Sequence, residues 1–345
     1  MNVDLGFVEE CSSGLLTNKY FPSKIGGKPA WLELKSLPKF KQLQCESCKE
    51  PKTFLCQVYA PDEDNPECFH RTVYVFVCRN PDCNIPNSSQ NFAVFRSQLE
   101  VTNNFFSEDP PDEDTESPAI PSPVTLCLIC GCRGPMSCAR CKKASYCCQS
   151  HQKADWKNHK VNCNAESTSN TSETPQTVLF PEFELVIEPE PSELEKDQQE
   201  TEEEANSRRL EEFKKLQEEG KTGDLKDLPE TELSQYAQSA EDVEDKTFKK
   251  FKKRIQRSPE QVLRYERNGK PLWITENTEE IKIPYCDNCG FERTFEFQIM
   301  PQLLNHLKDD KLDWGVLAVY TCKNDCSVLE GGYSIDYLIK QDISS

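Results

Sequence analysis

The chain has 345 residues, a formal net charge of −18 and 19 cysteines, but only four histidines. At about 150 residues per domain, this length predicts two or three folding units. The negative charge disfavours attraction of the whole chain to nucleic acid or anionic lipid, and it favours basic protein partners. No apolar run approaches the roughly 20 residues that span a membrane, so we expect no membrane association.

The high cysteine content suits metal binding better than disulfide bonding. The first residues, Met1 to Gly6, carry neither the basic segment nor the apolar run of a signal peptide. Disulfides belong mainly to secreted chains, whereas thiolate metal ligands persist in reducing compartments. We therefore expect a location in the cytoplasm and the nucleus.

Residues 1–105 form the first globular candidate, an N-terminal β half. Apolar runs rich in aromatic and β-branched side chains, at residues 54–59 and 73–77, predict strands. Residues 106–126 follow as an acidic linker. Proline and carboxylates dominate residues 107–123, so this segment has little apolar surface to bury and is expected to be solvated.

Residues 127–163 carry the densest group of metal-ligand side chains. Two Cys-x2-Cys knuckles precede two pairs of ligand residues at the i,i+4 spacing of a helix. Each knuckle presents two thiolates from one tight turn, and the two helical pairs lie too far apart to share an ion, so two zinc ions are predicted. The spacing leaves open which knuckle joins which pair. The candidate ligands are Cys127, Cys130, Cys138, Cys141, Cys147, His151, His159 and Cys163.

Residues 164–245 are rich in acidic side chains, and we expect them to be a largely disordered linker. One stretch differs, because residues 178–187 alternate apolar and acidic side chains with the period of a half-buried strand. We expect this strand to dock on a neighbour. A solvated helix is also predicted around residues 207–219.

Residues 246–345 form the second globular candidate, the C-terminal β half. It opens with a basic run at residues 249–254, which is typical of a nuclear localisation or nucleic-acid-binding patch. Phe248, Phe251 and Ile255 instead suit one face of a helix, so we interpret the run as the solvated basic face of that helix. Direct binding of nucleic acid is not expected.

The two globular ends match each other in sequence. Residues 27–31 and 269–273 share a Gly-Lys-Pro-x-Trp pattern, and a Cys-x2-Cys knuckle follows at nearly the same distance in both. Residues 54–58 then correspond to 295–299. Ordered matches at a nearly constant offset predict an internal repeat, with residues 127–163 and the linkers inserted between two copies.

In each copy four cysteines, including the knuckle, are arranged as two pairs with strand-like sequence between them. This arrangement resembles a zinc ribbon, in which a structural zinc contributes on the order of 10 kcal/mol to folding. Buried free cysteine is the alternative, because the second pair in each copy is spaced more widely than a usual knuckle. The candidate ligands are Cys45, Cys48, Cys78 and Cys83 in the first copy, and Cys286, Cys289, Cys322 and Cys326 in the second. With the two ions expected at residues 127–163, four zinc ions per chain are expected.

The segment of residues 127–163 resembles a MYND finger in the order of its knuckles, its Tyr-Cys and His-Gln dipeptides and its final histidine and cysteine. This resemblance implies interleaved pairing. The sixth ligand of the family is more often cysteine, so Cys148 competes with His151, and we favour His151 because its three-residue spacing recurs in the second pair. The implied ligand sets are Cys127, Cys130, Cys147 and His151 for one ion, and Cys138, Cys141, His159 and Cys163 for the other.

Gln152 and Trp156 lie one turn apart beside these ligands. In MYND relatives this region forms a groove for short proline-containing peptides, so the resemblance implies a peptide-binding role for both residues. The alternative is that Trp156 fills the small core of the finger.

The repeat with its inserted finger resembles the programmed cell death protein 2 family, on residues 21–24, 179–184, 299–304 and 313–315 as well as the motifs above. Members of this family act as dedicated chaperones for a newly made protein of the small ribosomal subunit and support ribosome assembly. The resemblance therefore implies a basic ribosomal client. Acidic segments that attract such a client, with apolar or strand-edge contacts that retain it, are physically compatible with this role.

No enzymatic function is expected. The chain has no His-Glu-x-x-His helix, no Gly-x-Ser-x-Gly elbow and no phosphate-binding Gly-rich loop. The competing hypothesis is a nuclear adaptor, in which the finger recruits peptide partners and the outer halves serve as a scaffold.

The predicted fold class is α+β and mainly antiparallel β. Two duplicated β halves, each with a zinc ribbon, should pack together as one unit because neither has enough strands to cover its own apolar face. The small helical finger should lie outside this unit.

Overall fold

The computed structural model describes residues 3–62, 64–112, 118–163, 178–191, 246–276, 282–327 and 332–342. The helix predicted around residues 207–219, and the disorder predicted for residues 164–177 and 192–245, lie outside the described residues. None of the described helices is long and apolar enough to cross a membrane.

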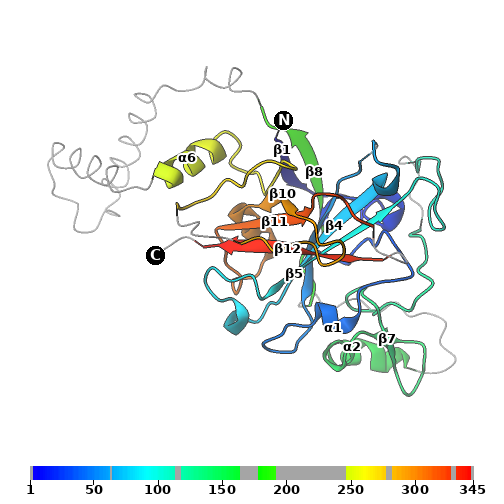
Figure 1. The fold of residues 1–345 in the computed structure, drawn as a ribbon. Coiled ribbons are helices and arrows are strands. Elements are labelled where there is room, and N and C mark those ends of the chain that lie inside the picture. The colour runs from blue at the N-terminus through cyan, green and yellow to red at the C-terminus, as the bar shows by residue number, and fades with distance from the viewer. Residues whose placement is uncertain are drawn as a thin grey trace, which may run out of the picture.

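The protein is built around a closed, ten-stranded antiparallel barrel with few helices (Figure 1). The strand order around the barrel is β1-β8-β2-β3-β4-β5-β12-β11-β10-β9. The strands are β1 (Asp4–Glu9), β2 (Lys24–Ile25), β3 (Thr53–Tyr59), β4 (His70–Val77), β5 (Phe92–Leu99), β8 (Phe183–Pro189), β9 (Leu263–Tyr265), β10 (Arg293–Ile299), β11 (Val316–Cys322) and β12 (Ser334–Gln341).

The remaining described elements are short, apart from two helices. A small hairpin of β6 (Met136–Ser137) and β7 (Ser145–Tyr146) belongs to the finger. The helices are α1 (Phe40–Leu43), α2 (Gln149–Asn162), α6 (Lys246–Ile255) and α7 (Leu304–Leu307), with 3-10 turns η1 (Asn18–Tyr20), η2 (Pro66–Cys68), η3 (Pro81–Cys83) and η5 (Pro301–Leu303).

Both ends of the chain contribute to one barrel core. Val73, Val75 and Val77 of β4 point inward, because alternate side chains of a strand share a face. They belong to the same buried cluster as Phe297 of β10 and Trp314, which precedes β11. Neighbouring strands of this barrel pair in the antiparallel direction, so the prediction of a mainly antiparallel β fold is confirmed.

The two halves place their strands in the same order. β2-β3-β4-β5 from the N-terminal half runs to β12-β11-β10-β9 from the C-terminal half through the β5–β12 pair. The β3–β4 ladder has a bulge between Phe54 and Cys56, and the β10–β11 ladder has one between Phe295 and Phe297. These bulges occupy the positions that the sequence match equates.

Two strands from opposite ends of the first 190 residues close the barrel. β1 pairs with β9 of the C-terminal half, while β8 pairs with β2 of the N-terminal half, and β1 and β8 pair with each other. The alternating stretch at residues 178–187 predicted a docked strand, and β8 is the strand found there. The barrel is closed, so it offers no open strand edge among the described strands.

A buried ion pair joins the halves inside the barrel. Both Arg71 of β4 and Glu296 of the β10 bulge are fully buried, and the guanidinium donates from both terminal nitrogens to the carboxylate. Its Nε also donates to Asp325 Oδ1 at 3.0 Å. Burial alone would raise the pKa of Glu296, but the charge and hydrogen bonds of Arg71 lower it to about 2.

The finger lies outside the closed barrel, as predicted, with β6 and β7 in a separate two-stranded sheet, but it is not detached from the barrel. The indole of Trp31 donates from Nε1 to the Gly131 carbonyl at 2.8 Å, and Lys28 Nζ donates to the Leu128 carbonyl at 2.7 Å. Trp31 also shares one apolar cluster with Ile129. Apolar surface on both sides drives this docking, which Figure 1 shows beside α1.

The segment at residues 106–126 is also less solvated than predicted. Asn18 exchanges hydrogen bonds with the backbone of Ile120, at 3.0 and 2.9 Å. The Ser122 hydroxyl donates to the Leu34 carbonyl at 2.8 Å, and Phe106 and Val124 pack on the same cluster as the finger. The average composition of the segment concealed these apolar anchors; residues 113–117, which carry several of its acids, lie outside the described residues.

Candidate metal centres

Four groups of cysteine and histidine have the geometry of metal sites. In each group the four ligand atoms all lie within 4.8 Å of one another. Zinc–sulfur bonds of about 2.3 Å in a tetrahedron place sulfurs about 3.8 Å apart. The groups are Cys45, Cys48, Cys78 and Cys83; Cys127, Cys130, Cys147 and His151; Cys138, Cys141, His159 and Cys163; and Cys286, Cys289, Cys322 and Cys326. All sixteen candidate ligands of the sequence analysis are thus brought together.

One backbone turn recurs in all four Cys-x2-Cys knuckles. The residue after the second cysteine has a positive φ, between 59° and 69°, and its N–H donates to the carbonyl of the first cysteine at 2.8 to 3.0 Å. This turn points both thiolates to the same side. The four residues are Lys49, Gly131, Lys142 and Gly290. The knuckle is therefore a local structure that its own backbone hydrogen bond defines.

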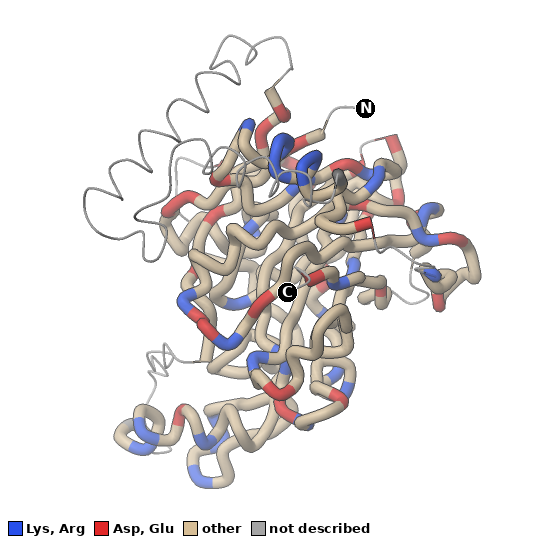
Figure 2. Tube along the Cα trace, turned by 90° about the vertical axis from the view of Figure 1, so that its left-hand side faces the viewer, with Lys and Arg blue, Asp and Glu red and all other residues tan. Residues whose placement is uncertain are grey.

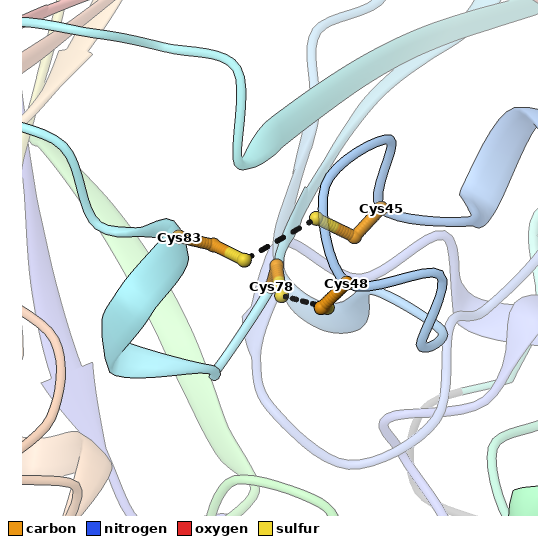
Figure 3. A group of neighbouring side chains, drawn as sticks. All are labelled: Cys45, Cys48, Cys78 and Cys83. Carbon is orange, nitrogen blue, oxygen red and sulfur yellow. Dashed lines mark hydrogen bonds between the residues drawn. The ribbon is translucent and has the colours of Figure 1, made fainter.

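The first ribbon site joins that knuckle to the end of β4 (Figure 3). Cys48 and Cys78 sulfurs lie 3.5 Å apart, and Cys45 and Cys83 sulfurs 3.7 Å apart. The wide spacing of the second pair fits because the η3 turn brings Cys83 back, with the Asn80 side chain capping the Asp82 N–H at 3.1 Å. These separations match a tetrahedral thiolate site.

Backbone N–H groups stabilise thiolates in these knuckles. Burial tends to raise the pKa of Cys45, but hydrogen bonds from the backbone of Cys48 and Ser47 lower it to about 7. The Cys141 pKa likewise falls to about 6, where the backbone of Ala144 and Lys143 overcomes the effect of burial. A ligand that is already inclined to ionise loses its proton more readily to a metal.

The second ribbon site repeats this arrangement with less cover. Sulfurs of Cys286 and Cys326 lie 3.5 Å apart, and those of Cys289 and Cys322 lie 3.6 Å apart. Cys289 is exposed and Cys326 is half-buried, whereas three of the four cysteines in the first ribbon are buried. Tyr285 and Phe291, which flank the knuckle, are 66% and 43% exposed.

The finger pairs its ligands in the interleaved order that the MYND resemblance implied. The first knuckle joins the earlier helical pair, with Cys130 and Cys147 sulfurs 3.7 Å apart and His151 Nδ1 at 3.7 Å from the Cys127 sulfur. Cys148 lies near this site, 3.6 Å from the Cys147 sulfur, but it is not part of the four-ligand group. His151 is the residue that completes the group.

The second finger site joins the other knuckle to the last turn of α2. Cys138 and Cys163 sulfurs lie 3.7 Å apart, and His159 Nε2 lies 3.5 Å from the Cys141 sulfur. Between the two sites the Tyr146 hydroxyl donates to the buried Asp155 carboxylate at 2.7 Å. This bond ties the β7 strand to α2 and so fixes the spacing of the two ligand groups.

The proposed peptide-binding pair has one exposed aromatic. Trp156 of α2 is 44% exposed, so the alternative that it fills the core of the finger is wrong. Its ring lies beside His159, with centroids 6.2 Å apart. Gln152 lies one turn earlier on the same helix and is half-buried.

Two residues with structural importance had no functional role in the sequence analysis. Trp31, the last residue of the repeated Gly-Lys-Pro-x-Trp pattern, is buried, and its indole N–H also binds the finger. Arg71 was not singled out at all. Its position two residues before the inward-facing Val73 was the available signal, because side chains two apart in a strand share a face.

Comparisons with known proteins agree with this architecture. The programmed cell death protein 2 N-terminal domain matches residues 2–113, the MYND finger matches residues 127–163, and the programmed cell death protein 2 C-terminal putative domain matches residues 245–342. The MYND finger is a zinc-binding module, and the buried thiolate and imidazole groups of residues 127–163 fit zinc. No solved structure matches the chain significantly.

Several curated relatives are similar over nearly the whole chain. Programmed cell death protein 2 of Rattus norvegicus is 43% identical across 100% of this chain and 97% of that protein, and the protein of that name from Bos taurus is 42% identical across 99% and 96%. Over 21% of this chain and 22% of that protein, the Probable 20S rRNA accumulation protein 4 of Schizosaccharomyces pombe is 34% identical. With two family domains flanking a MYND finger and this degree of identity over full length, the chain belongs to the programmed cell death protein 2 family.

Proposed function

We propose that this protein is a zinc-binding chaperone for a newly made, basic protein of the small ribosomal subunit, and that it supports assembly of the 40S subunit. The observation that carries the proposal is the similarity of part of this chain to a relative named for accumulation of 20S rRNA, together with the family to which the chain belongs. The remaining support is physical and comes from charge and exposed apolar surface.

Charge favours capture of a basic client. The chain carries a net charge of −18, and opposite charge accelerates encounter by electrostatic steering. This steering is screened over about 8 Å at physiological ionic strength. Association with the client should therefore slow steeply as salt is added.

Exposed apolar groups offer a surface that retains the client. Tyr285, Phe291 and Ile335 surround the second ribbon and are each more than 40% exposed. Contacts of this kind survive salt, so dissociation should change little with ionic strength. The closed barrel disfavours the alternative of strand-edge pairing with the client.

The four-zinc stoichiometry remains part of this proposal. Sixteen ligands fall into four groups of equivalent geometry, so each β half should hold one ion and the finger two. Metal analysis of the purified chain tests the count. Two ions per chain would contradict the ribbon sites and leave the finger intact.

We also propose that the two β halves arose by duplication and that the chain divides as the sequence suggested. The assigned units are residues 1–105, an acidic linker at 106–126, the finger at 127–163, a linker at 164–245 and residues 246–345. Matching strand order and matching bulges support the duplication. A non-catalytic role in the cytoplasm and nucleus completes the proposal.

Native purification followed by mass spectrometry of bound proteins tests the client. One basic small-subunit ribosomal protein should copurify, and the double variant Tyr285→Ser with Phe291→Ser should reduce its recovery about tenfold. The matched control changes two exposed apolar residues elsewhere, Ile85→Ser with Val161→Ser, and should retain the client. Recovery of no ribosomal protein would refute the chaperone role.

The alternative function is a nuclear adaptor that recruits proline-containing peptides through the finger. The exposure of Trp156 is the observation that favours it. Deleting the whole finger is a poor test, because it would uncover Trp31 and its cluster. Gln152→Ala with Trp156→Ala is cleaner: an adaptor would lose its partners, whereas a chaperone would keep its client.

A further inference from the structure

A basic cavity lies between α6 and the C-terminal half of the barrel. Lys250, Lys253 and Arg254 face it from α6, and Arg257 follows one turn later, at the spacing of residues that share one helical face. Arg264 of β9 and Lys270 line it as well. The cavity holds about 530 Å³, so it is large enough for a small ligand.

The packing of α6 on the barrel places these cations at the cavity. Phe251 and Ile255 are buried against Met300 and Val316 of the barrel, which fixes the rotation of α6. Lys250 and Lys253 lie away from this apolar contact and remain exposed. Figure 2 shows the Lys and Arg positions on successive turns of α6 in the upper part of the view, on the side of the barrel away from the finger.

The cavity contains more cations than carboxylates. Glu190, which follows β8, pairs with both Arg254 and Arg264. Glu190 does not itself line the cavity, and Glu266 is the one acidic residue among the described residues that do. Within the described part of the chain, Lys250, Lys253 and Lys270 form no ion pair.

The positive charge of this cavity contrasts with the negative net charge of the whole chain. The protein as a whole carries −18, yet one concave site brings together cations from the helix, β9 and the following turn. Like charges held close together repel, and an anion that enters between them relieves the repulsion. A dianionic phosphate group relieves it more than a single carboxylate, and its oxygens accept from both lysine and arginine donors.

We propose that the cavity between α6 and the barrel binds a phosphate-bearing ligand, either a free polyphosphate compound or a phosphorylated side chain of a protein partner. Phe295, buried below the cations, and Leu272 give the site an apolar floor. This floor accommodates the part of the ligand that carries no charge. The site is separate from the four metal centres and does not depend on the chaperone proposal.

Calorimetric titration of the zinc-loaded, full-length chain with inorganic tripolyphosphate tests the cation site. Lys250→Gln with Lys253→Gln should weaken binding by about tenfold or more, because two donors leave the cavity. The matched control is Lys249→Gln with Lys252→Gln, which removes the same charge from α6 at positions outside the lining and should change the Kd less than about twofold. Equal loss in both variants, or no binding by the unmodified chain at millimolar tripolyphosphate, would overturn the proposal.

Peptide titrations identify the source of the phosphate. A phosphoserine peptide that binds more tightly than tripolyphosphate, and that loses affinity with Lys250→Gln and Lys253→Gln, assigns the site to a protein partner. Tighter binding of tripolyphosphate assigns it to a free compound. The proposal fails if the same peptide with glutamate in place of phosphoserine binds equally well, or if a short single-stranded RNA of the same charge binds more tightly than either.

Discussion

The two ribbon sites have the same ligands and different surroundings. In the first, the finger packs against the base of the knuckle, where Leu43 and Pro51 face Cys130 and Cys147 across a small gap. In the second, the residues beside the knuckle, Tyr285 and Phe291, are exposed. One copy of the fold has its partner within the chain, whereas the other presents the corresponding region to solvent.

This difference distinguishes the features that both halves share, which serve folding, from the surface around each ribbon, which is available for binding in only one half. The knuckle turn and the four cysteines are present in both halves, as the proposed stabilisation of each small β unit by a zinc ion requires. The finger covers the first ribbon, whereas Tyr285 and Phe291 beside the second ribbon are exposed. The uncovered ribbon is therefore the better candidate for an external partner, and the covered one for a structural role.

The halves differ inside the barrel as well. The bulge position of β3 is Leu55, a core residue, and the matching position of β10 is Glu296. Arg71 corresponds in register to Gly315, so only one half supplies the cation. The buried ion pair thus specifies which strand of one half faces which strand of the other.

The largest expected effect comes from removing one zinc ligand from either ribbon. Cys48→Ser and Cys289→Ser occupy equivalent knuckle positions, and each should lower the zinc content by one ion. Because a structural zinc contributes on the order of 10 kcal/mol, both variants should unfold at markedly lower temperature. Metal analysis and thermal unfolding check this. Unchanged zinc in the Cys289→Ser variant would mean that only the covered ribbon binds metal.

The asymmetric ion pair offers the next largest effect. Arg71→Met leaves Glu296 buried without its main partner and should cost about 3 to 5 kcal/mol in the free energy of unfolding. Adding Glu296→Leu restores the side chain that the other half uses at Leu55, so the double variant should recover much of this loss. Urea unfolding of the two single variants and the double variant measures the coupling. Additive losses would show that the pair does not act as a unit.

A smaller effect is expected where the finger meets the barrel. Trp31→Phe keeps an aromatic ring but removes the hydrogen bond to Gly131, which should cost about 1 kcal/mol. Chelator should then withdraw zinc from the first ribbon faster, while the exposed second ribbon is unaffected. The Cys289→Ser variant identifies which phase of zinc release belongs to the second ribbon. Faster release from both ribbons would contradict a local role for Trp31.

The ion pair between Arg71 and Glu296 also predicts a dependence of stability on pH. The pKa of Glu296 is about 2 in the folded protein, below its ordinary value of 4.5, so its ion pair stabilises the fold above about pH 4.5 and loses this effect as the pH falls toward 2. Glu296→Gln lacks this ionisation. The difference in unfolding free energy between wild type and Glu296→Gln should narrow as the pH decreases below about 5. Loss of zinc in acid affects both proteins and cancels in the difference; a constant difference would contradict an ionised Glu296.

The sequence by itself determined the candidate metal ligands, which the structure brings into four groups, and the strand-rich architecture. Knuckle spacing and the i,i+4 pairs of α2 act over a few residues, so the turn at Lys49 or Gly290 follows from local backbone geometry. Alternation of apolar side chains similarly indicated β8. These signals depend on neighbours along the chain, which the sequence shows directly.

Only the tertiary structure decided how these parts meet. Spacing alone left the pairing of the finger ligands open, and the sequence did not show that the finger packs on Trp31. Closure of the barrel by β1 and β8, and the contact of Arg71 with Glu296, join residues that are far apart in sequence. Such contacts arise because apolar surfaces and buried charges must each find a partner in the folded chain, and no local pattern names that partner.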